Sequence, residues 1–267
     1  MKNPTLESLS DARRDCALAM LEMYKKANAG HIGSSLSCLE ILVDLCFHRA
    51  RPEDFIILSK GHAAAALYAT FKLSGRLPEA DLATFYKEGT SLAAHPPCSK
   101  AFDAIPFGTG SLGHGLSLGV GLALSTRFTG KSLSCYVVLS DGDCNEGSTW
   151  EGAAFAAHHK LSNLVVIIDL NSIQGFGRCS EVLDNTHVVE KWKSFGFSVA
   201  VAEDGNSFES LKRAFEEAGG NPGPRCIIAK TIKGHGVSYM EDTVAWHYLP
   251  MSDAQYAQAV AETRGLS

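Results

Sequence analysis

The sequence predicts an α/β fold in which an open, mainly parallel sheet carries helices on both of its faces. Short apolar runs recur along the chain, and segments with helical spacing of apolar residues separate them. Because these runs do not alternate between apolar and polar residues, each is typical of a strand that is buried on both sides. Helices that alternate with buried strands indicate parallel strands joined by right-handed crossovers.

The first part of the sequence predicts two helices, a strand and a further helix. Apolar residues recur at near-helical spacing over residues 5–28, and the pattern stops at Gly30. A second helix is expected over residues 37–47. The apolar run at residues 55–58 predicts a short strand, and a helix is expected between the polar segment after it and Leu73.

The middle of the sequence contains the clearest pattern. A glycine-rich segment at residues 108–115 precedes a helix of small residues that is expected to reach about Phe128. Two buried strands are then predicted at residues 136–139 and 164–168, and a helix over residues 145–160 joins them. This β-α-β unit predicts two parallel strands with a right-handed crossover.

The same alternation continues through the last third of the sequence. The expected elements are helices over residues 188–194, 208–218 and 253–263 and strands over residues 197–201 and 226–229. Pro222 and Pro224 mark the turn before the last strand. No repeat and no low-complexity linker divides the sequence, so we expect residues 1–267 to form a single domain.

Composition argues against several classes of protein. The formal net charge is −5 and the basic residues are scattered, which argues against nucleic-acid binding. No apolar run approaches the ~20 residues that cross a bilayer, and no secretion signal is evident. The eight cysteines form no C-x-x-C pair, which predicts reduced, mostly buried thiols. We therefore expect a cytoplasmic protein that binds neither nucleic acid nor membrane.

Polar residues follow each predicted strand, and ligands of open α/β sheets bind at the carboxyl ends of the strands. Asp141 and Asn171 follow two strands that should be neighbours. Their carboxylate and amide oxygens suit Mg²⁺ or Ca²⁺, and Mg²⁺ commonly completes its octahedron with phosphate oxygens and water. Gly142 would let the backbone approach a phosphate, and a helix starting near Asn145 would point its amides there. The alternative reading makes Asp141 and Asn145 turn and capping residues.

Six short segments, in order, match motifs of one enzyme family. Ser140-Asp141-Gly142 with Asn171 resembles the G-D-G…N signature of thiamine-diphosphate enzymes, and Asn145-Glu146-Gly147 and Trp150-Glu151-Gly152 look like its transketolase version. The other segments are Gly30-His31-Ile32-Gly33-Ser34, Ser59-Lys60-Gly61-His62-Ala63, Ala94-His95-Pro96, residues 109–115, and Lys230-Thr231-Ile232-Lys233-Gly234 with Trp246-His247. Together they resemble the transketolase family over essentially the whole chain.

This resemblance implies the thiamine-diphosphate-binding fold, and within it the diphosphate-binding domain. It implies a metal ion, Mg²⁺ with Ca²⁺ or Mn²⁺ as substitutes, held by Asp141, Asn171 and the backbone carbonyl of Ile173. The residues implied to contact thiamine diphosphate are His62, Gly110, Ser111, Leu112, Gly142, Asn171 and His247.

The catalytic residues implied by the resemblance are His31, His95, His247 and Glu146. The three histidines would face the substrate, and Glu146 would reach across a subunit interface. Thiamine diphosphate supplies the ylid and the electron sink, so the protein supplies placement and proton transfers, which histidine can serve near neutral pH. For Lys60 and Lys233 two readings stay open: they steer a sugar phosphate, or they are solvated loop lysines.

The resemblance also implies a partner. In full-length relatives a pyrimidine-binding domain follows this one and carries the glutamate that activates the cofactor. No residues are left for it here, so we expect a separate C-terminal transketolase subunit to supply it, with two copies of each chain. Such a split transketolase would move a two-carbon ketol unit from a ketose or ketose phosphate to an aldose or aldose phosphate.

The sequence departs from the family's pattern at three positions. Ser140 replaces the first glycine of the signature, Ile32 stands where longer relatives usually carry proline, and Tyr248 follows His247 where glycine is common. The change at Tyr248 is expected to reshape the substrate channel.

Two other functions stay open at this point. One is a different thiamine reaction, such as 1-deoxyxylulose-5-phosphate synthesis or the decarboxylation of a 2-oxo acid. The other is a non-catalytic regulatory subunit that keeps a cofactor pocket.

Overall fold

The sheet of this protein has five parallel strands in the order β1-β2-β3-β5-β4. We describe a computed structural model that covers residues 4–98, 102–220 and 222–265. The strands are β1 (Phe55–Leu58), β2 (Cys135–Ser140), β3 (Leu164–Leu170), β4 (Ser198–Ala202) and β5 (Arg225–Lys230). The expected open parallel sheet, and the pairing of the strands at the centre of the sequence, are confirmed.

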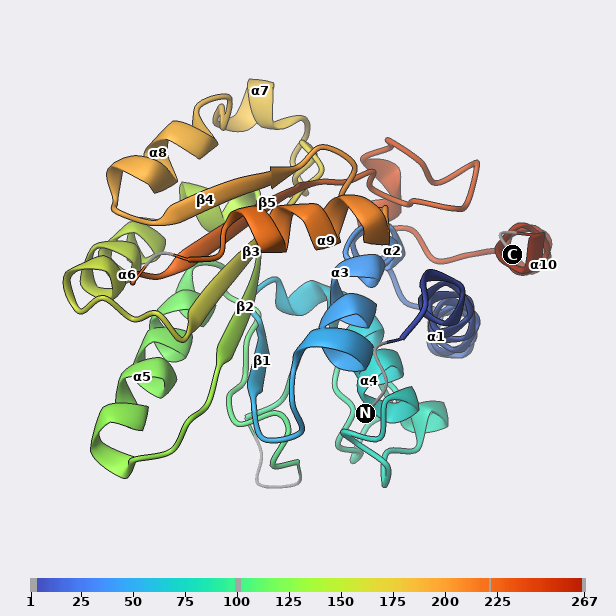
Figure 1. Cartoon of the computed structure of the whole chain (residues 1–267). Coiled ribbons are helices and arrows are strands. Elements are labelled where there is room, and N and C mark those ends of the chain that lie inside the picture. Colours follow the sequence, from blue (N-terminus) through green and yellow to red (C-terminus); the bar gives the residue numbers. More distant parts are fainter. Residues whose placement is uncertain (1–3, 99–101, 221, 266–267) are drawn as a thin grey trace.

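Helices connect and cover these strands (Figure 1). They are α1 (Leu6–Ala27), α2 (Ile32–Ser37), α3 (Leu39–Asp44), α4 (Ala64–Leu73), α5 (His114–Thr129), α6 (Gly147–His158), α7 (Cys179–Val182), α8 (Val188–Ser194), α9 (Phe208–Glu217) and α10 (Asp253–Gly265). Short 3₁₀ turns cover Gly61–Ala63, Leu82–Thr84, Gly142–Asn145 and Ala245–His247. Within the residues described above, no helix is long and apolar enough to cross a membrane.

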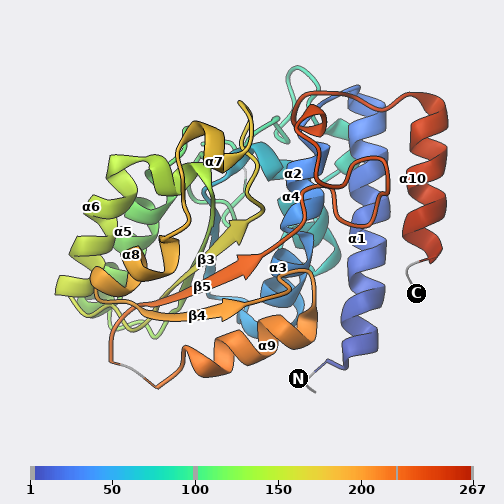
Figure 2. The same ribbon diagram turned by 90° about the horizontal axis from the view of Figure 1, so that it is seen from above.

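Alternate residues of each strand enter one of two hydrophobic cores. Val138 and Ile167 pack with α1, α2, α3, α4, α9 and α10, whereas Val137 and Ile168 pack with α5, α6 and α8. This alternation follows from the two-residue period of a strand and explains why the strands are apolar on both faces. In Figure 2, α10 lies alongside α1 at the margin of the first core. The eight cysteines are free thiols, and six of them are buried.

The register of the central strands brings their carboxyl ends to one edge of the sheet. Ser140 at the end of β2 pairs with Asp169 on β3, and Leu170 at the end of β3 pairs with Lys230 on β5. Asp141 and Asn171 are the first residues beyond their strands, and Asn171 lies one position further out because β3 extends one residue past the end of β2. Figure 2 shows β3, β4 and β5 pointing toward the segments that carry α2 and the loop after β5.

The helix expected over residues 37–47 is present as α3, which a π-helical turn, Leu45–Arg49, continues. A separate short helix before it, α2, begins at Ile32, ends at Ser37 and was not predicted. The glycine and serines of α2 are poor helix formers, but every residue of this helix is buried. A side chain at Gly33 would come within 3.1 Å of the Trp246 carbonyl, so the small residue is required by packing rather than by helix propensity.

The helix expected from Asn145 begins later than predicted. A 3₁₀ turn over Gly142–Asn145 follows β2 directly, and α6 starts at Gly147 with Glu146 as its N-cap residue. The backbone immediately after Asp141 is therefore a 3₁₀ turn and not the first turn of the helix. Helix α7, with only four residues, was not predicted because one turn leaves no periodic pattern.

The contact between α5 and the sheet gives a first testable prediction. A methyl group at Gly119 would overlap a methyl group of Val137 on β2. We expect Gly119→Ala to lower the free energy of unfolding by about 1–3 kcal/mol, because the core must shift to accept it. Urea denaturation measures this change.

Gly121 on the same helix is the matched control. It is exposed, and an added methyl group meets nothing within 4 Å. Gly121→Ala should raise stability by up to about 1 kcal/mol through helix propensity alone. Equal effects at the two positions would contradict the packing explanation.

Candidate active site

A cavity of about 250 Å³ opens at the carboxyl edge of the sheet. Of the site residues singled out in the sequence, those that line it are His31, His62, His95, Gly110, Leu112, Asp141, Gly142, Asn171, Ile173 and His247. They come from the start of α2, from loops before α4 and α5, from the ends of β2 and β3, and from the segment after β5. Parallel strands explain this convergence of distant segments, since their carboxyl ends share one edge.

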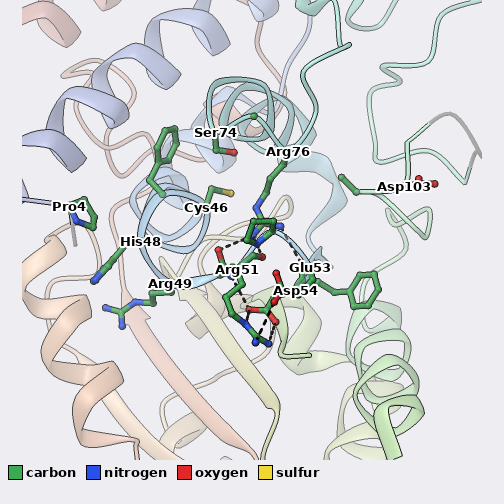
Figure 3. Close-up of a pocket in the computed structure, with 16 residues that line it drawn as sticks. Pro4, Cys46, His48, Arg49, Arg51, Glu53, Asp54, Ser74, Arg76 and Asp103 are labelled. Carbon is green, nitrogen blue, oxygen red and sulfur yellow. Dashed lines mark hydrogen bonds and ion pairs between the residues drawn. The ribbon is translucent and has the colours of Figure 1, made fainter. Parts of the chain in front are cut away.

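A larger cavity, of about 690 Å³, lies near the start of β1 and is lined by none of these residues (Figure 3). Two of its three arginines bind protein groups through several contacts. Arg51 pairs with Asp54 at 2.8 Å, and Arg76 donates to the backbone carbonyls of Ala50 and Arg51 at 3.0 and 2.6 Å. Because these guanidinium groups are engaged, the larger volume is not the better candidate site.

Asp141 and Asn171 lie side by side at the ends of β2 and β3. The Oδ2 atom of Asp141 accepts hydrogen bonds from the backbone N–H groups of Asn171 and Ser172, at 3.1 and 3.2 Å. The side chain of Asn171 accepts from the Ile173 N–H at 3.0 Å and donates to the Ser37 hydroxyl at 2.9 Å. The amide of Asn171 is therefore held at both its oxygen and its nitrogen, whereas Asp141 is held through one carboxylate oxygen, and both side chains are buried.

The other carboxylate oxygen of Asp141 fits a bound cation. This oxygen, Oδ1, is buried and has no hydrogen-bond partner within the described parts of the chain, so its desolvation is uncompensated. Burial, reinforced by the charge of Asp169, raises the pKa of Asp141 to about 6. A cation beside Oδ1 would replace the missing hydrogen bond and would favour the ionised form of the carboxylate.

The donors that Asp141, Asn171 and Ile173 offer are oxygen atoms, and burial raises the pKa of the neighbouring Cys179 thiol to about 12, so this thiol stays protonated. No group of three or more His, Cys, Asp or Glu side chains is arranged to hold a metal ion in the part of the chain that the structure describes. One carboxylate, one amide oxygen and one backbone carbonyl are hard ligands, which suit a hard cation that keeps several positions for a ligand phosphate and water.

Lys233 contacts Ile173 and His247, two residues assigned to the site from the sequence. Its ammonium donates to the backbone carbonyl of Ile173 at 3.3 Å and lies 3.1 Å from Nδ1 of His247. Burial and the charge of Lys60 lower the pKa of Lys233 to about 8, so the ammonium persists at pH 7. An ammonium has donors only, so Nδ1 of His247 accepts and the neutral imidazole carries its proton on Nε2.

Four histidines form a cluster in the cavity. The ring centroids of His31 and His247 are 5.1 Å apart, and those of His62 and His247 are 5.2 Å apart. His31 lies 5.6 Å from His62 and 5.9 Å from His95. His31 has a left-handed backbone, with φ of 74°, which its own N–H stabilises by donating to the carbonyl of His247 at 3.0 Å.

All four histidines are held in the neutral form at pH 7. Burial and the charge of Lys233 lower the pKa of His247 to about 3. Burial also lowers the pKa of His31, His62 and His95, and Lys60 adds to this effect at His62. Neutral imidazoles can both accept and donate a proton, which is what acid–base chemistry at the cavity needs.

Lys60 and Asp169 form an ion pair in the protein interior. Both residues are 0% exposed, and the Lys60 ammonium also donates to the Ser34 carbonyl at 3.0 Å. Asp169 accepts further hydrogen bonds from Ser37, at 2.7 Å, and from Thr231. Burial alone would lower the pKa of Lys60, but the Asp169 charge outweighs burial and the pKa is raised. The reading of Lys60 and Lys233 as solvated loop lysines is therefore wrong.

Asp143 organises the loop after β2, a role that sequence reasoning missed. Its carboxylate accepts from the Ser59 hydroxyl at 2.6 Å, the Gly113 N–H at 2.7 Å and the Ser140 N–H at 2.8 Å. It thereby ties the end of β1, the segment before α5 and the end of β2 together. Its place directly after the signature was the available signal, but an Asp there is also an ordinary turn residue.

Two of the sequence-predicted residues do not line the cavity. Ser111 and Glu146 are both exposed, although the neighbours of Ser111 are lining residues. Glu146 packs its stem where a side chain at Gly113 would otherwise lie. His235, whose role sequence reasoning left undecided, pairs instead with Glu40 at 3.1 Å and lies outside the cavity.

Seven lining residues were not predicted to be catalytic, cofactor-binding or metal-binding, although Tyr248 was expected to reshape the substrate channel and one reading of Lys60 had it steer a sugar phosphate. They are Ser34, Lys60, Ser140, Gln174, Gly175, Phe176 and Tyr248. Three of them follow Ile173 on the loop after β3, where position after a strand end was a usable signal. The others depend on long-range packing that spacing along the chain does not reveal.

Comparisons with known proteins agree with this geometry. The family model described as "Transketolase, thiamine diphosphate binding domain" matches residues 10–265. The chain belongs to the transketolase family. The expectation drawn from its short motifs is confirmed, and the cavity described above lies in this family's thiamine-diphosphate-binding domain.

Transketolase relatives of two lengths match the chain. An apulose-4-phosphate transketolase subunit of Phocaeicola vulgatus is 37% identical over 98% of this chain and 95% of the relative. Transketolase of Pongo abelii is 37% identical over 96% of this chain and 42% of the relative. The solved transketolase from Leishmania mexicana matches with a TM-score of 0.85 and 26% identity, over 98% of this chain and 42% of that one. The chain thus spans less than half of the longer transketolases.

The buried ion pair gives a second prediction. Lys60→Met leaves the Asp169 carboxylate buried without its cation, so we expect the free energy of unfolding to fall by about 3–5 kcal/mol. The double variant Lys60→Met/Asp169→Leu should recover much of this loss. Urea denaturation of both variants measures the difference.

The exposed pair of Arg178 and Asp242 is the matched control for the ion pair. Its side chains are 49% and 63% exposed, so Arg178→Ala should cost less than about 1 kcal/mol. A double variant at Lys60 and Asp169 that is no more stable than Lys60→Met would contradict the explanation by an uncompensated charge.

The lowered histidine pKa values give a third prediction. Below pH 6.5 the unfolded chain protonates these histidines while the folded chain does not, down to a pKa of about 3 for His247. Their contribution to stability is present above pH 6.5 and is lost as the pH falls. Protonation of Asp141 has the opposite effect on stability between its ordinary pKa and about 6, but it is a single group and four histidines act the other way.

We therefore expect the free energy of unfolding to fall between pH 7 and pH 5, with His247 contributing about 1 kcal/mol after its partial exposure is allowed for. In His247→Gln the fall should be smaller by that amount. His187→Gln, which changes a histidine that is 78% exposed, should leave the fall unchanged. An equal fall in wild type and His247→Gln would refute the prediction.

Proposed function

We propose that this chain is the diphosphate-binding subunit of a split transketolase, a transferase that moves a two-carbon ketol unit from a ketose or ketose phosphate to an aldose or aldose phosphate. The observation that carries the proposal is the uncompensated Asp141 carboxylate beside Asn171 in a cavity walled by four neutral histidines. The close match in length to a relative named as a transketolase subunit supports the split arrangement.

Residues of this chain supply the elements of a cofactor and metal site. Asp141 through Oδ1, Asn171 through its amide oxygen and Ile173 through its backbone carbonyl would hold Mg²⁺, with Ca²⁺ or Mn²⁺ as substitutes. The residues proposed to contact thiamine diphosphate are His62, Gly110, Ser111, Leu112, Gly142, Asn171 and His247. The bound cofactor would supply the electron sink that carbon–carbon bond cleavage requires.

The histidine cluster would handle the protons of the transfer. Lys233 fixes the His247 proton on Nε2, so His247 is placed to donate a hydrogen bond to a substrate oxygen. The neutral His31 and His95 can accept the proton of a substrate hydroxyl. The low pKa of His247 favours the donor role over that of a base, because its neutral form binds a further proton only weakly.

The surroundings of the cavity support a requirement for a second chain. Among the described residues, six of the eleven large hydrophobic residues that are exposed lie on the segments after β3 and β5. This exposed rim consists of Phe176, Val182, Leu183, Ile232, Tyr248 and Leu249. Apolar side chains gathered beside a cavity are typical of an interaction surface.

We propose that the rim docks a C-terminal transketolase subunit with the pyrimidine-binding domain, that exposed Glu146 meets this interface, and that two copies of each chain assemble. The described chain would then be one diphosphate-binding domain, supporting a single-domain reading.

An activity assay of the assembled enzyme tests the proposed function. The chain is purified alone and with its co-purifying partner, and ketol transfer is measured with Mg²⁺, thiamine diphosphate, a panel of ketose donors and an aldose acceptor. We expect activity only for the pair. Full activity of the isolated chain would refute the split site, and activity with pyruvate but with no ketose would favour another thiamine reaction.

Asp141→Ala tests the metal site within the same assay. Loss of a residue that hydrogen-bonds to a metal ligand typically costs about 10–100-fold, so loss of a direct ligand should reduce ketol transfer by more than this. Mg²⁺-dependent binding of thiamine diphosphate, measured by calorimetry, should also be lost. Asp11→Ala, which changes an exposed aspartate on α1, is the control. Undiminished cofactor binding in Asp141→Ala would remove this residue from the metal site.

His247→Ala tests the proton chemistry separately from cofactor binding. We expect turnover to fall by roughly 10²–10⁴-fold, because the substrate oxygen loses its donor, while thiamine diphosphate still binds through the metal and its remaining contacts. Steady-state kinetics and calorimetry measure the two effects. An unchanged rate would exclude His247 from the mechanism.

A further inference from the structure

Tyr248 occupies an unusual position for an aromatic residue, because its backbone is fixed while its side chain stands in the cavity. It follows the 3₁₀ turn Ala245–His247, and its backbone N–H donates a hydrogen bond to the Ala245 carbonyl at 3.0 Å. Its own carbonyl packs against Gly30 so closely that any side chain there would overlap it. The side chain is nevertheless 56% exposed and lines the cavity.

The Tyr248 ring spans from the His247 side of the cavity to the loop after β3. Its centroid is 4.8 Å from the His247 centroid, with an angle of 62° between the rings. A side chain at Gly175 would come within 2.7 Å of the Tyr248 hydroxyl and 3.1 Å of Nε2 of His247. The hydroxyl of Tyr248 and the proton-bearing nitrogen of His247 therefore contact the same glycine.

This arrangement limits the space next to Nε2 of His247. A substrate atom that reaches this nitrogen has the Tyr248 ring directly beside it and the Gly175 backbone opposite. Within the described residues no hydrogen bond holds the Tyr248 hydroxyl, and the ring fills space beside His247. Bulk in a site discriminates substrates by carbon-chain size, with about 10–200-fold for a single methylene group.

We infer that Tyr248 is a specificity-determining residue, which restricts the acceptor to aldehydes with a short carbon chain beyond the reacting carbonyl. The inference rests on the proposed ketol transfer, and it assigns to this chain a part in the choice of acceptor.

The test compares acceptors of two sizes in the assembled enzyme at saturating partner. With hydroxypyruvate as donor, kcat/KM is measured for glycolaldehyde, with two carbons, and for D-erythrose, with four. In Tyr248→Ala we expect the ratio of D-erythrose to glycolaldehyde to rise by about tenfold or more. In Tyr248→Phe, which keeps the ring, the ratio should stay within about twofold of wild type.

Phe128→Ala is the control, because Phe128 on α5 is an aromatic residue that is 83% exposed, lies outside the exposed rim and does not line the cavity. It should leave the acceptor ratio unchanged. A ratio that stays constant in Tyr248→Ala, or that changes equally in Tyr248→Phe, would overturn the inference. If the wild-type pair transfers no ketol unit, the proposed function fails instead, so the two failures are distinguishable.

Discussion

The buried ion pair between Lys60 and Asp169 holds together the segments that form the cavity at the carboxyl edge of the sheet. Lys60 follows β1, Asp169 lies on β3, and their shared partners reach α2 and the segment after β5. A buried pair of this kind contributes little net stability, but neither partner tolerates a different position. The segments that build the cavity are thus connected through one charged contact, and the cavity's shape follows from where that contact lies.

The same buried charges determine the electrostatics of the cavity. Burial, reinforced by the charges of Lys60 and Lys233, keeps His62 and His247 neutral, and Lys233 selects the tautomer of His247. The carboxylate of Asp141 is left with one uncompensated oxygen in the same region. The site therefore combines neutral histidines, which can exchange protons, with a carboxylate that favours a bound cation. This environment suits a metal-bound diphosphate beside a reacting carbon.

The fold and much of the cavity could be predicted because their signals are local. Apolar runs identified β2 and β3, and parallel geometry then placed Asp141 beside Asn171. Other features depend on tertiary packing. Burial makes a helix of the weakly helix-forming sequence at Ile32–Ser37, and only the assembled fold shows that Lys60 is buried. The orientation of Tyr248 follows from contacts with distant glycines, which no window of sequence contains.

The left-handed backbone of His31 has a consequence for how this edge of the molecule meets a ligand. A non-glycine residue with φ of 74° is uncommon, and it persists here because the His31 N–H is held by the carbonyl of His247. This backbone hydrogen bond joins the two main chains, and the ring centroids of His31 and His247 lie 5.1 Å apart before any ligand binds. Folding of the chain therefore already brings the two imidazoles together, so an incoming ligand does not have to assemble them.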